Sequence, residues 1–452
     1  MGRSEPVLLL FFVCAAFARQ PGNVEAAVNE TIRRVEARDF KSASVALKRY
    51  AVLYPNDVRL WNLLGVSEGE LGRIPAARDA FERGLKIAPN NVSLNENLGF
   101  LYYRQDRFAD AKPYLEKAIA LGSRNPGVAF SLGAAKIRTG ERDRGLSELK
   151  LLEVPLADFP DYWDERGWAE LAQDPAAAET DFSRALSLAP DDLRALNGAA
   201  SAAEIQKLDE KALSFLLRAR QAHPGDVDTL VHLGAVCLRR DLTIDALATL
   251  EHAYRIAPSN NAALYLYARA QIGVRQWQKS HDLFSEFARR IPKFADTYYA
   301  LGWLDIKLNR RAEARRELEQ CLRLEPNSAD PRYELAQLDL DDGEIDLAEK
   351  LLRAVLDQDP KHAKANVAYG DILLKRGDFA AARAHYETAI QSNASSGAAH
   401  YKLSSALFRL DRTEEAEKER ALGARLNQEE LKSNKTVLRL ASPDGALLSA
   451  AP

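Results

Sequence analysis

The chain has 452 residues, of which 46% are hydrophobic and 28% charged, and its formal net charge is −3. A nearly neutral chain has no electrostatic footprint for nucleic acid or for an anionic membrane surface, so neither is predicted as a partner. The length exceeds that of an ordinary single domain, whereas a repeat array, whose core grows in one direction, has no such limit.

The first residues differ from the rest of the chain. One arginine in "MGRSEP", the apolar run "VLLLFFVCAAFA" and small residues at Ala16 and Ala18 are typical of a secretory signal peptide. We predict a signal peptide over 1–18 and an exported mature chain that is periplasmic or extracellular, from a bacterial source. An uncleaved anchor is the alternative, although the run is shorter than the roughly 20 apolar residues that span a bilayer. No later segment is apolar enough to span, so the mature chain is expected to have no transmembrane span.

Prolines then recur with a fixed period. The step between neighbouring members is 34 residues, except for one step of 101 residues, which is three periods less one. The members are Pro55, Pro89, Pro190, Pro224, Pro258, Pro292, Pro326 and Pro360. Each follows an apolar turn such as "LKIAPNN" (85–91), and proline ends the helix there because it has no N–H to donate. A period in this range indicates an array of units that bury their apolar faces against their neighbours.

One unit, residues 58–91, contains two amphipathic helices. Apolar or small residues recur at Trp61, Leu64 and Gly65, and again at Ala77 and after it, with a turn between the two groups. This spacing fits two helices of about 12 residues joined by a turn. The unit is therefore a helical hairpin, and the sequence predicts an all-α fold.

The pattern W-x2-L-G, then A-x3-F, then P resembles the tetratricopeptide repeat. With Val58 numbered as position 1, position 20 is Ala, Gly or Ser in twelve consecutive units. The resemblance implies a right-handed α-solenoid superhelix of about twelve 34-residue helix-turn-helix repeats. We expect it to occupy residues 19–430 and to be followed by a C-terminal capping segment with a disordered tail at 431–452.

The register breaks between residues 150 and 178. Pro155 and Pro160 replace a single proline at 157, and Ala178 arrives one residue early. One interpretation is a tolerated deletion with a shortened turn around Asp174. The other is a local kink that exposes two aromatic and four acidic residues to a partner. These are Tyr162, Trp163, Asp158, Asp161, Asp164 and Glu165.

We find no catalytic motif. The seven histidines are scattered, and no HExxH, GxSxG or phosphate-binding loop is present in the sequence. We therefore predict no catalytic residue, metal or cofactor. Cys237 and Cys321 are interpreted as small core residues, since the helices that carry them are too far apart in the array for a disulfide.

In tetratricopeptide-repeat proteins the first helix of each repeat lines a concave surface, mainly through positions 2, 5, 9, 12 and 13. Transferred to this chain, these positions give ten candidate partner-binding residues: Phe100, Phe130, Trp168, Tyr265, Arg269, Tyr299, Trp303, Lys307, Tyr333 and Tyr401. Position 9 is expected to face solvent, so Trp303 is predicted as a contact residue. The carboxylate clamp of co-chaperones requires asparagine at position 9, which no repeat has.

The predicted function is that of a non-enzymatic scaffold whose partner is a protein or a peptide. It would bind an extended protein segment or bridge subunits of an envelope complex. The alternative is a regulatory or substrate-binding subunit of an enzyme carried on a separate chain, such as a glycosyltransferase or a protease.

Overall fold

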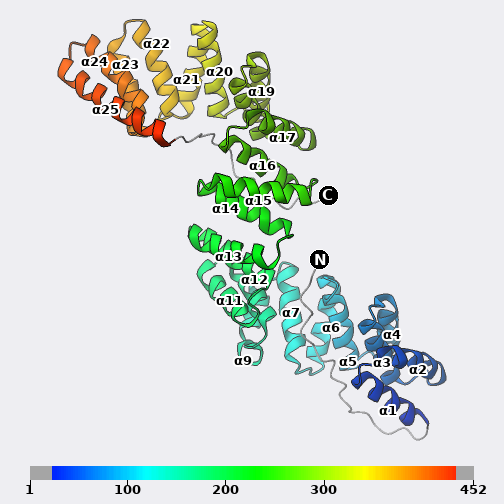
Figure 1. Cartoon of the computed structure of the whole chain (residues 1–452). Coiled ribbons are helices and arrows are strands. Elements are labelled where there is room, and N and C mark those ends of the chain that lie inside the picture. Colours follow the sequence, from blue (N-terminus) through cyan, green and yellow to red (C-terminus); the bar gives the residue numbers. More distant parts are fainter. Residues whose placement is uncertain (1–22, 434–452) are drawn as a thin grey trace. The chain divides into compact units, whose positions relative to one another are not determined.

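The computed structural model describes residues 23–433, and this part of the chain contains 25 α-helices and no strand (Figure 1). The helices pair into twelve consecutive hairpins, which confirms the predicted all-α repeat array. The predicted signal peptide at 1–18 and the tail beyond Ser433 lie outside the described residues.

The first, or A, helices of the repeats are α1 (Asn23–Glu36), α3 (Val58–Glu70), α5 (Val92–Tyr103), α7 (Pro126–Arg138), α10 (Pro160–Glu170), α12 (Leu193–Ile205), α14 (Val227–Arg239), α16 (Asn261–Gly273), α18 (Ala295–Lys307), α20 (Ala329–Asp342), α22 (Ala363–Lys375) and α24 (Gly397–Arg409).

The second, or B, helices are α2 (Phe40–Leu53), α4 (Ile74–Ile87), α6 (Phe108–Ala120), α8 (Arg142–Lys150), α11 (Pro175–Leu188), α13 (Asp209–Ala222), α15 (Thr243–Ile256), α17 (Trp277–Arg290), α19 (Arg311–Leu324), α21 (Ile345–Gln358), α23 (Phe379–Ser392) and α25 (Thr413–Ser433). The short helix α9 (Glu153–Leu156) follows α8 and has no counterpart in the other repeats.

Small residues let the A and B helices of a repeat approach closely. A Cβ atom added to Gly99 would lie 2.6 Å from Leu115 Cδ2, and one added to Gly302 would lie 2.7 Å from Leu318 Cγ. Both distances are shorter than van der Waals contact allows, so a larger side chain at position 8 would push the helices apart.

The loops after the B helices explain the recurrent apolar-proline segments. After Pro89, Asn91 caps α5 by accepting a hydrogen bond from Leu94 N. Asp192 and Asn260 cap the A helices of later repeats in the same way. The proline ends one helix, and the polar residue that follows satisfies a free N–H at the start of the next.

The turn from helix A to helix B places its position-15 residue in the left-handed region in eleven repeats. The φ values run from 57° to 92°, and the residues are Arg38, Gly72, Asp106, Gly140, Lys207, Asp241, Arg275, Asn309, Gly343, Gly377 and Asp411. The fifth repeat lacks this residue, and its A helix α10 has 11 residues, fewer than any other A helix. Four residues, 171–174, separate α10 from α11, so the predicted shortened turn is wrong and the deletion shortens the helix α10 instead. Asp174 caps α11 by accepting from Ala177 N, and Pro175 starts that helix.

The chain divides into two compact units, one up to His223 and the other from Pro224 onward. We call them unit 1 and unit 2 and describe each by itself. Both predicted core cysteines are buried, Cys237 in α14 and Cys321 in α19, and burial raises the pKa of the Cys321 thiol to about 12. At the C-terminal end α25 continues to Ser433, so the start of the predicted capping segment belongs to the last B helix.

Candidate functional site

Within each unit, several A helices of successive repeats lie next to one another. In unit 1, α5 packs beside α7 and α10 beside α12, and in unit 2, α20 packs beside α22 and α22 beside α24. We call the side of these helices that carries repeat positions 2, 5, 9 and 13 the A-helix face. All ten predicted binding residues belong to it by position, and their exposure decides which of them a partner could reach.

Two of the predicted binding tyrosines of unit 2, Tyr265 and Tyr299, belong to the core. Tyr265 is fully buried, and its ring centroid lies 5.5 Å from that of Phe284 and 5.2 Å from that of Phe287. Tyr299 is also buried, whereas Tyr333 is partly buried. Burial raises the pKa of all three phenols. The prediction that Tyr265 and Tyr299 line an accessible concave surface is therefore wrong, because their rings fill space between helices.

Trp303 does not face solvent as expected for position 9. Its side chain is 8% exposed and stacks edge to face with Trp277, at a centroid distance of 5.6 Å. Trp277 is the first residue of α17, so the preceding B helix supplies a ring that covers the indole. The expectation that the Trp303 indole faces solvent is therefore wrong. By contrast, the predicted binding residue Tyr401, at position 5 of the last repeat, is 49% exposed.

Exposed lysines lie over two of these rings. Lys307 Nζ is 4.9 Å from the ring centroid of Trp303, and Lys364 Nζ is 5.6 Å from that of Tyr333. Both lysine side chains are exposed. Both charges also act on Glu334, whose pKa is nevertheless raised by burial. Cation–π attraction restricts these ammonium groups while leaving them open to a ligand.

Arg269 combines partial burial with the absence of a partner. Among the described residues, no hydrogen bond or ion pair involves its guanidinium. Burial lowers the pKa of Arg269, although Tyr265 and Asp296 oppose the shift. The guanidinium is therefore partly removed from solvent and has no acceptor within the described residues.

The A-helix face of unit 1 is more closed. Phe100 and Phe130 are buried, and Phe130 packs edge to face against Phe159 with centroids 5.7 Å apart. Trp168 is partly buried against Phe182 at 5.5 Å. Phe100 and Phe130 are thus core residues, and Trp168 is the one predicted aromatic of this unit that stays partly accessible.

A charged cluster lies beside them at the register break. Asp164 and Glu165 are each 5% exposed, and Arg194 NH1 lies 2.7 Å from Asp164 Oδ2 and 3.0 Å from Glu165 Oε1. Arg138 also pairs with Glu165, at 2.9 Å. Burial, opposed by Arg194, raises the pKa of Asp164 to about 7. Arg138 and Arg194, which belong to the same unit, therefore pair with the two carboxylates.

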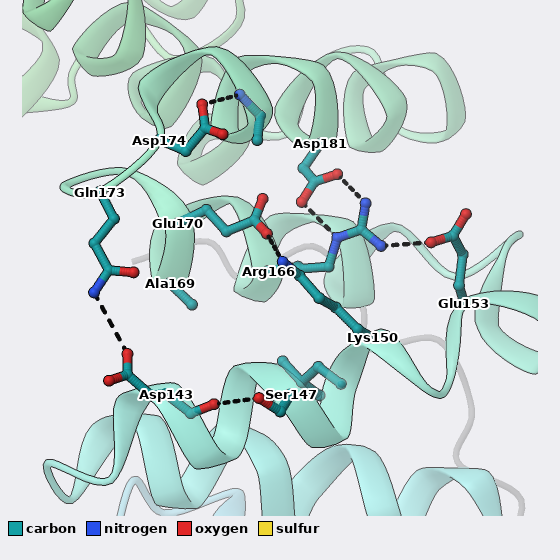
Figure 2. Close-up of polar contacts among 12 residues, drawn as sticks. Asp143, Ser147, Lys150, Glu153, Arg166, Ala169, Glu170, Gln173, Asp174 and Asp181 are labelled. Carbon is teal, nitrogen blue, oxygen red and sulfur yellow. Dashed lines mark hydrogen bonds and ion pairs between the residues drawn. The ribbon is translucent and has the colours of Figure 1, made fainter.

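The alternative of an exposing kink is wrong for its aromatic residues, because Tyr162 and Trp163 are buried. The guanidinium of Arg166 lies over both rings, with its carbon 4.5 Å from the Trp163 ring centroid. Figure 2 shows Arg166 donating to Asp181, with Nε to Oδ2 at 2.6 Å, and to Glu153 at 2.8 Å. A Lys150–Glu170 ion pair of 2.7 Å joins α8 to α10 in the same view. Only Asp158 and Asp161 of the six residues are exposed.

Among residues 23–433, no group of three or more His, Cys, Asp or Glu side chains could hold a metal ion. Within the same described range, no helix has the length and apolarity to cross a bilayer.

Sequence reasoning missed the cation–aromatic pairs. Lys364 is at position 2 of its repeat, and Tyr333 is at position 5 of the preceding one. A search for a cation at position 2 that follows an aromatic residue at position 5 would have found this pair. The absence of a hydrogen-bond or ion-pair partner for Arg269 could not be predicted from the sequence, because it depends on where the side chains of neighbouring helices lie.

Comparison with known protein families supports the repeat assignment. A tetratricopeptide repeat model matches more than half of the chain, and a second tetratricopeptide repeat model matches a further segment. The first covers residues 29–92, 167–227, 299–363, 333–393 and 367–425, and the second covers 96–124.

Curated relatives share parts of the chain. Aspartyl/asparaginyl beta-hydroxylase of Mus musculus is 31% identical over 120 residues, which is 25% of this chain and 16% of that protein. Protein CTR9 homolog of Arabidopsis thaliana is 22% identical over 372 residues, or 78% of this chain and 30% of that protein. Protein O-mannosyl-transferase TMTC3 of Homo sapiens is 24% identical over 200 residues, or 41% and 22% respectively. The chain thus spans less than a third of each of these relatives.

Solved structures with a similar course include the APC/C hetero-tetramer Cut9-Hcn1, at a TM-score of 0.45 and 13% identity, covering 95% of this chain and 90% of that one. Yeast Tom70 has a TM-score of 0.42 and 14% identity, covering 91% and 94%. The family assignment does not depend on these likenesses. It depends on the repeat models together with the twelve hairpins, and the chain belongs to the tetratricopeptide repeat family.

Proposed function

We propose that the protein is a non-enzymatic scaffold that binds an extended protein segment on the A-helix face of unit 2. The repeat family supports the general role of a protein-interaction scaffold. The proposal adds the location of the contact and the form of the ligand.

The observation that carries the proposal is the pair of exposed lysines held over aromatic rings. Lys307 belongs to α18 and Lys364 to α22. The positive charge of each lysine attracts the carboxylate of Glu334 in α20, which is partly buried. Charges that are already restricted lose less conformational entropy when a ligand binds. A chain that passes across these helices in an extended form could contact both lysines in turn.

The test uses the partner that co-purifies with the tagged chain from the native envelope fraction. Once it is identified, its affinity is measured for Lys307→Ser, Lys364→Ser and the double variant. We expect the double variant to bind at least about tenfold more weakly, because two charged contacts are lost.

Lys279→Ser is the matched control. Lys279 is also exposed and lies over an aromatic ring, with Nζ 5.1 Å from the Tyr267 centroid, but it belongs to the B helix α17. Equal losses for the control and the A-helix variants, or no loss in either, would reject this face as the binding surface. Trp303→Ala is unsuited to the test, since removing a buried indole also disturbs packing.

Export is part of the proposal and is supported by the residues 1–18 alone. The mature N-terminus should be Arg19, because Ala16 and Ala18 provide small residues at the cleavage spacing. The intact mass of the protein purified from its native source measures this directly. A mass that retains residues 1–18 would remove cleavage from the proposal.

A second candidate function is that of a regulatory or substrate-binding subunit for an enzyme on another chain. It is favoured by the similarity of short stretches of the chain to proteins named as a beta-hydroxylase and an O-mannosyl-transferase. The same purification separates the two candidates, because an enzyme among the co-purifying chains would support the second.

A further inference from the structure

The unpartnered guanidinium of Arg269 is the feature of unit 2 that its own fold leaves unexplained. Arg269 is at position 9 of α16, which places it on the A-helix face. Its side chain is partly buried, so it keeps access to solvent. A guanidinium has five N–H donors and no acceptor, and in folded proteins a desolvated one is normally matched by a carboxylate or by carbonyl oxygens.

Other arginines of the chain show what this match looks like. Arg166 and Arg194, both partly buried, form ion pairs with buried carboxylates. Every other partly buried arginine in the described part of the chain likewise has at least one hydrogen bond or ion pair. Arg269 is the exception within residues 23–433.

The surroundings of Arg269 favour an anionic ligand. The titratable groups that act on it are Tyr265, which is fully buried, and Asp296 of α18. Asp296 attracts the guanidinium electrostatically, and Arg269 itself has no hydrogen bond or ion pair within the described residues. The donors therefore remain available, and their desolvation strengthens any charge-assisted hydrogen bond that they make.

We infer that Arg269 is a carboxylate-binding subsite, which receives an acidic side chain or a free C-terminal carboxylate of the bound segment. This inference deepens the proposed function and rests on it. It assigns to the ligand a carboxylate at the point where the segment crosses α16. A guanidinium can form a bidentate pair with a carboxylate, whereas the ammonium groups of Lys307 and Lys364 cannot.

The test selects 12-residue peptides on the full mature chain from two random libraries, one with the peptide C-terminus blocked and one with it free. The same selection is run on Arg269→Gln. Selected peptides are resynthesised as free acids and as amides, and with Asp and Glu replaced by Asn and Gln. Arg289→Gln, an exposed arginine of the B helix α17, is the control variant.

We expect wild-type selections to be enriched in a carboxylate at one peptide position, either an acidic side chain or the free C-terminus. Arg269→Gln should weaken the resynthesised peptides about 10- to 100-fold, and Arg289→Gln should leave them unchanged. The loss should not increase further when the peptide carboxylate is neutralised as well, because both changes remove the same contact.

Two results overturn the inference and differ from each other. Peptides that bind wild type and Arg269→Gln equally, or that show no preference for a carboxylate, reject the subsite while leaving the binding face intact. Failure of both libraries to yield any binding peptide rejects the proposed function and the subsite together. Circular dichroism confirms that each variant is folded, and we expect Arg269→Gln to be folded because it removes an uncompensated charge.

Discussion

The residue at position 15 has a positive φ in eleven of the A–B turns, so its identity affects the free energy of unfolding. At position 15 four repeats have a glycine with φ between 72° and 92°, while Lys207 adopts φ 60° with a Cβ atom present. A non-glycine residue in this region costs about 1–2 kcal/mol through contact of Cβ with the backbone. This cost is offset in part because glycine loses more entropy on folding.

Lys207→Gly should therefore stabilise the protein by about 0.5–1 kcal/mol, and Gly343→Ala, at φ 84°, should destabilise it by about 1 kcal/mol. Urea unfolding followed by circular dichroism measures both changes. Two variants that shift in the same direction would show that the turn conformation is not the cause.

Asp164 makes stability depend on pH. Its folded pKa of about 7 lies above the ordinary value of 3.8, because burial outweighs the attraction of Arg194 and because Glu165, Asp192 and Asp161 repel its charge. A group with a raised folded pKa contributes stability that is complete below the unfolded pKa and is lost as the pH rises through the folded pKa. The loss should occur between about pH 4 and pH 7.

Asp164→Asn removes this titration. Compared with wild type, the variant should gain on the order of 2 kcal/mol when the pH is raised from 5 to 8. Urea unfolding at the two pH values provides the measurement, with Asp158→Asn, an exposed carboxylate, as the control. Parallel stability curves for Asp164→Asn and wild type would contradict the account of this cluster.

At the scale of the helices, stability should be local. Leu352 of α21 is fully buried and packs in one cluster with Ala336 of α20 and Tyr369 of α22. Leu352→Ala should cost about 2–5 kcal/mol. Because repeats contact only their neighbours, hydrogen exchange should rise first in α20–α22. An equal rise in α3–α5 would indicate one global core in place of a chain of coupled repeats.

The repeat unit could be predicted from the sequence because one physical constraint recurs twelve times. Close helix crossing requires a small residue at the positions of Gly99 and Gly302, and proline must end each B helix, so both leave periodic signals. The binding face could not be predicted as well. Position numbers place Trp303 and Tyr265 on the A-helix face, but Trp277 and the Phe284–Phe287 pair cover them, and these contacts involve residues of several helices.

For the whole molecule, the central claim is that a partner lies against A helices and avoids B helices. Tyr401 of α24 and Leu347 of α21 are matched for a test, since each is 49% exposed. Tyr401 belongs to an A helix and Leu347 to a B helix, so exposure alone cannot distinguish them. The measurement is photo-crosslinking in the native cell, with a benzophenone amino acid placed at one site or the other in the full-length chain. The account predicts a discrete crosslinked protein from position 401 and none from position 347. Crosslinking from 347 alone, or equally from both positions, would contradict it.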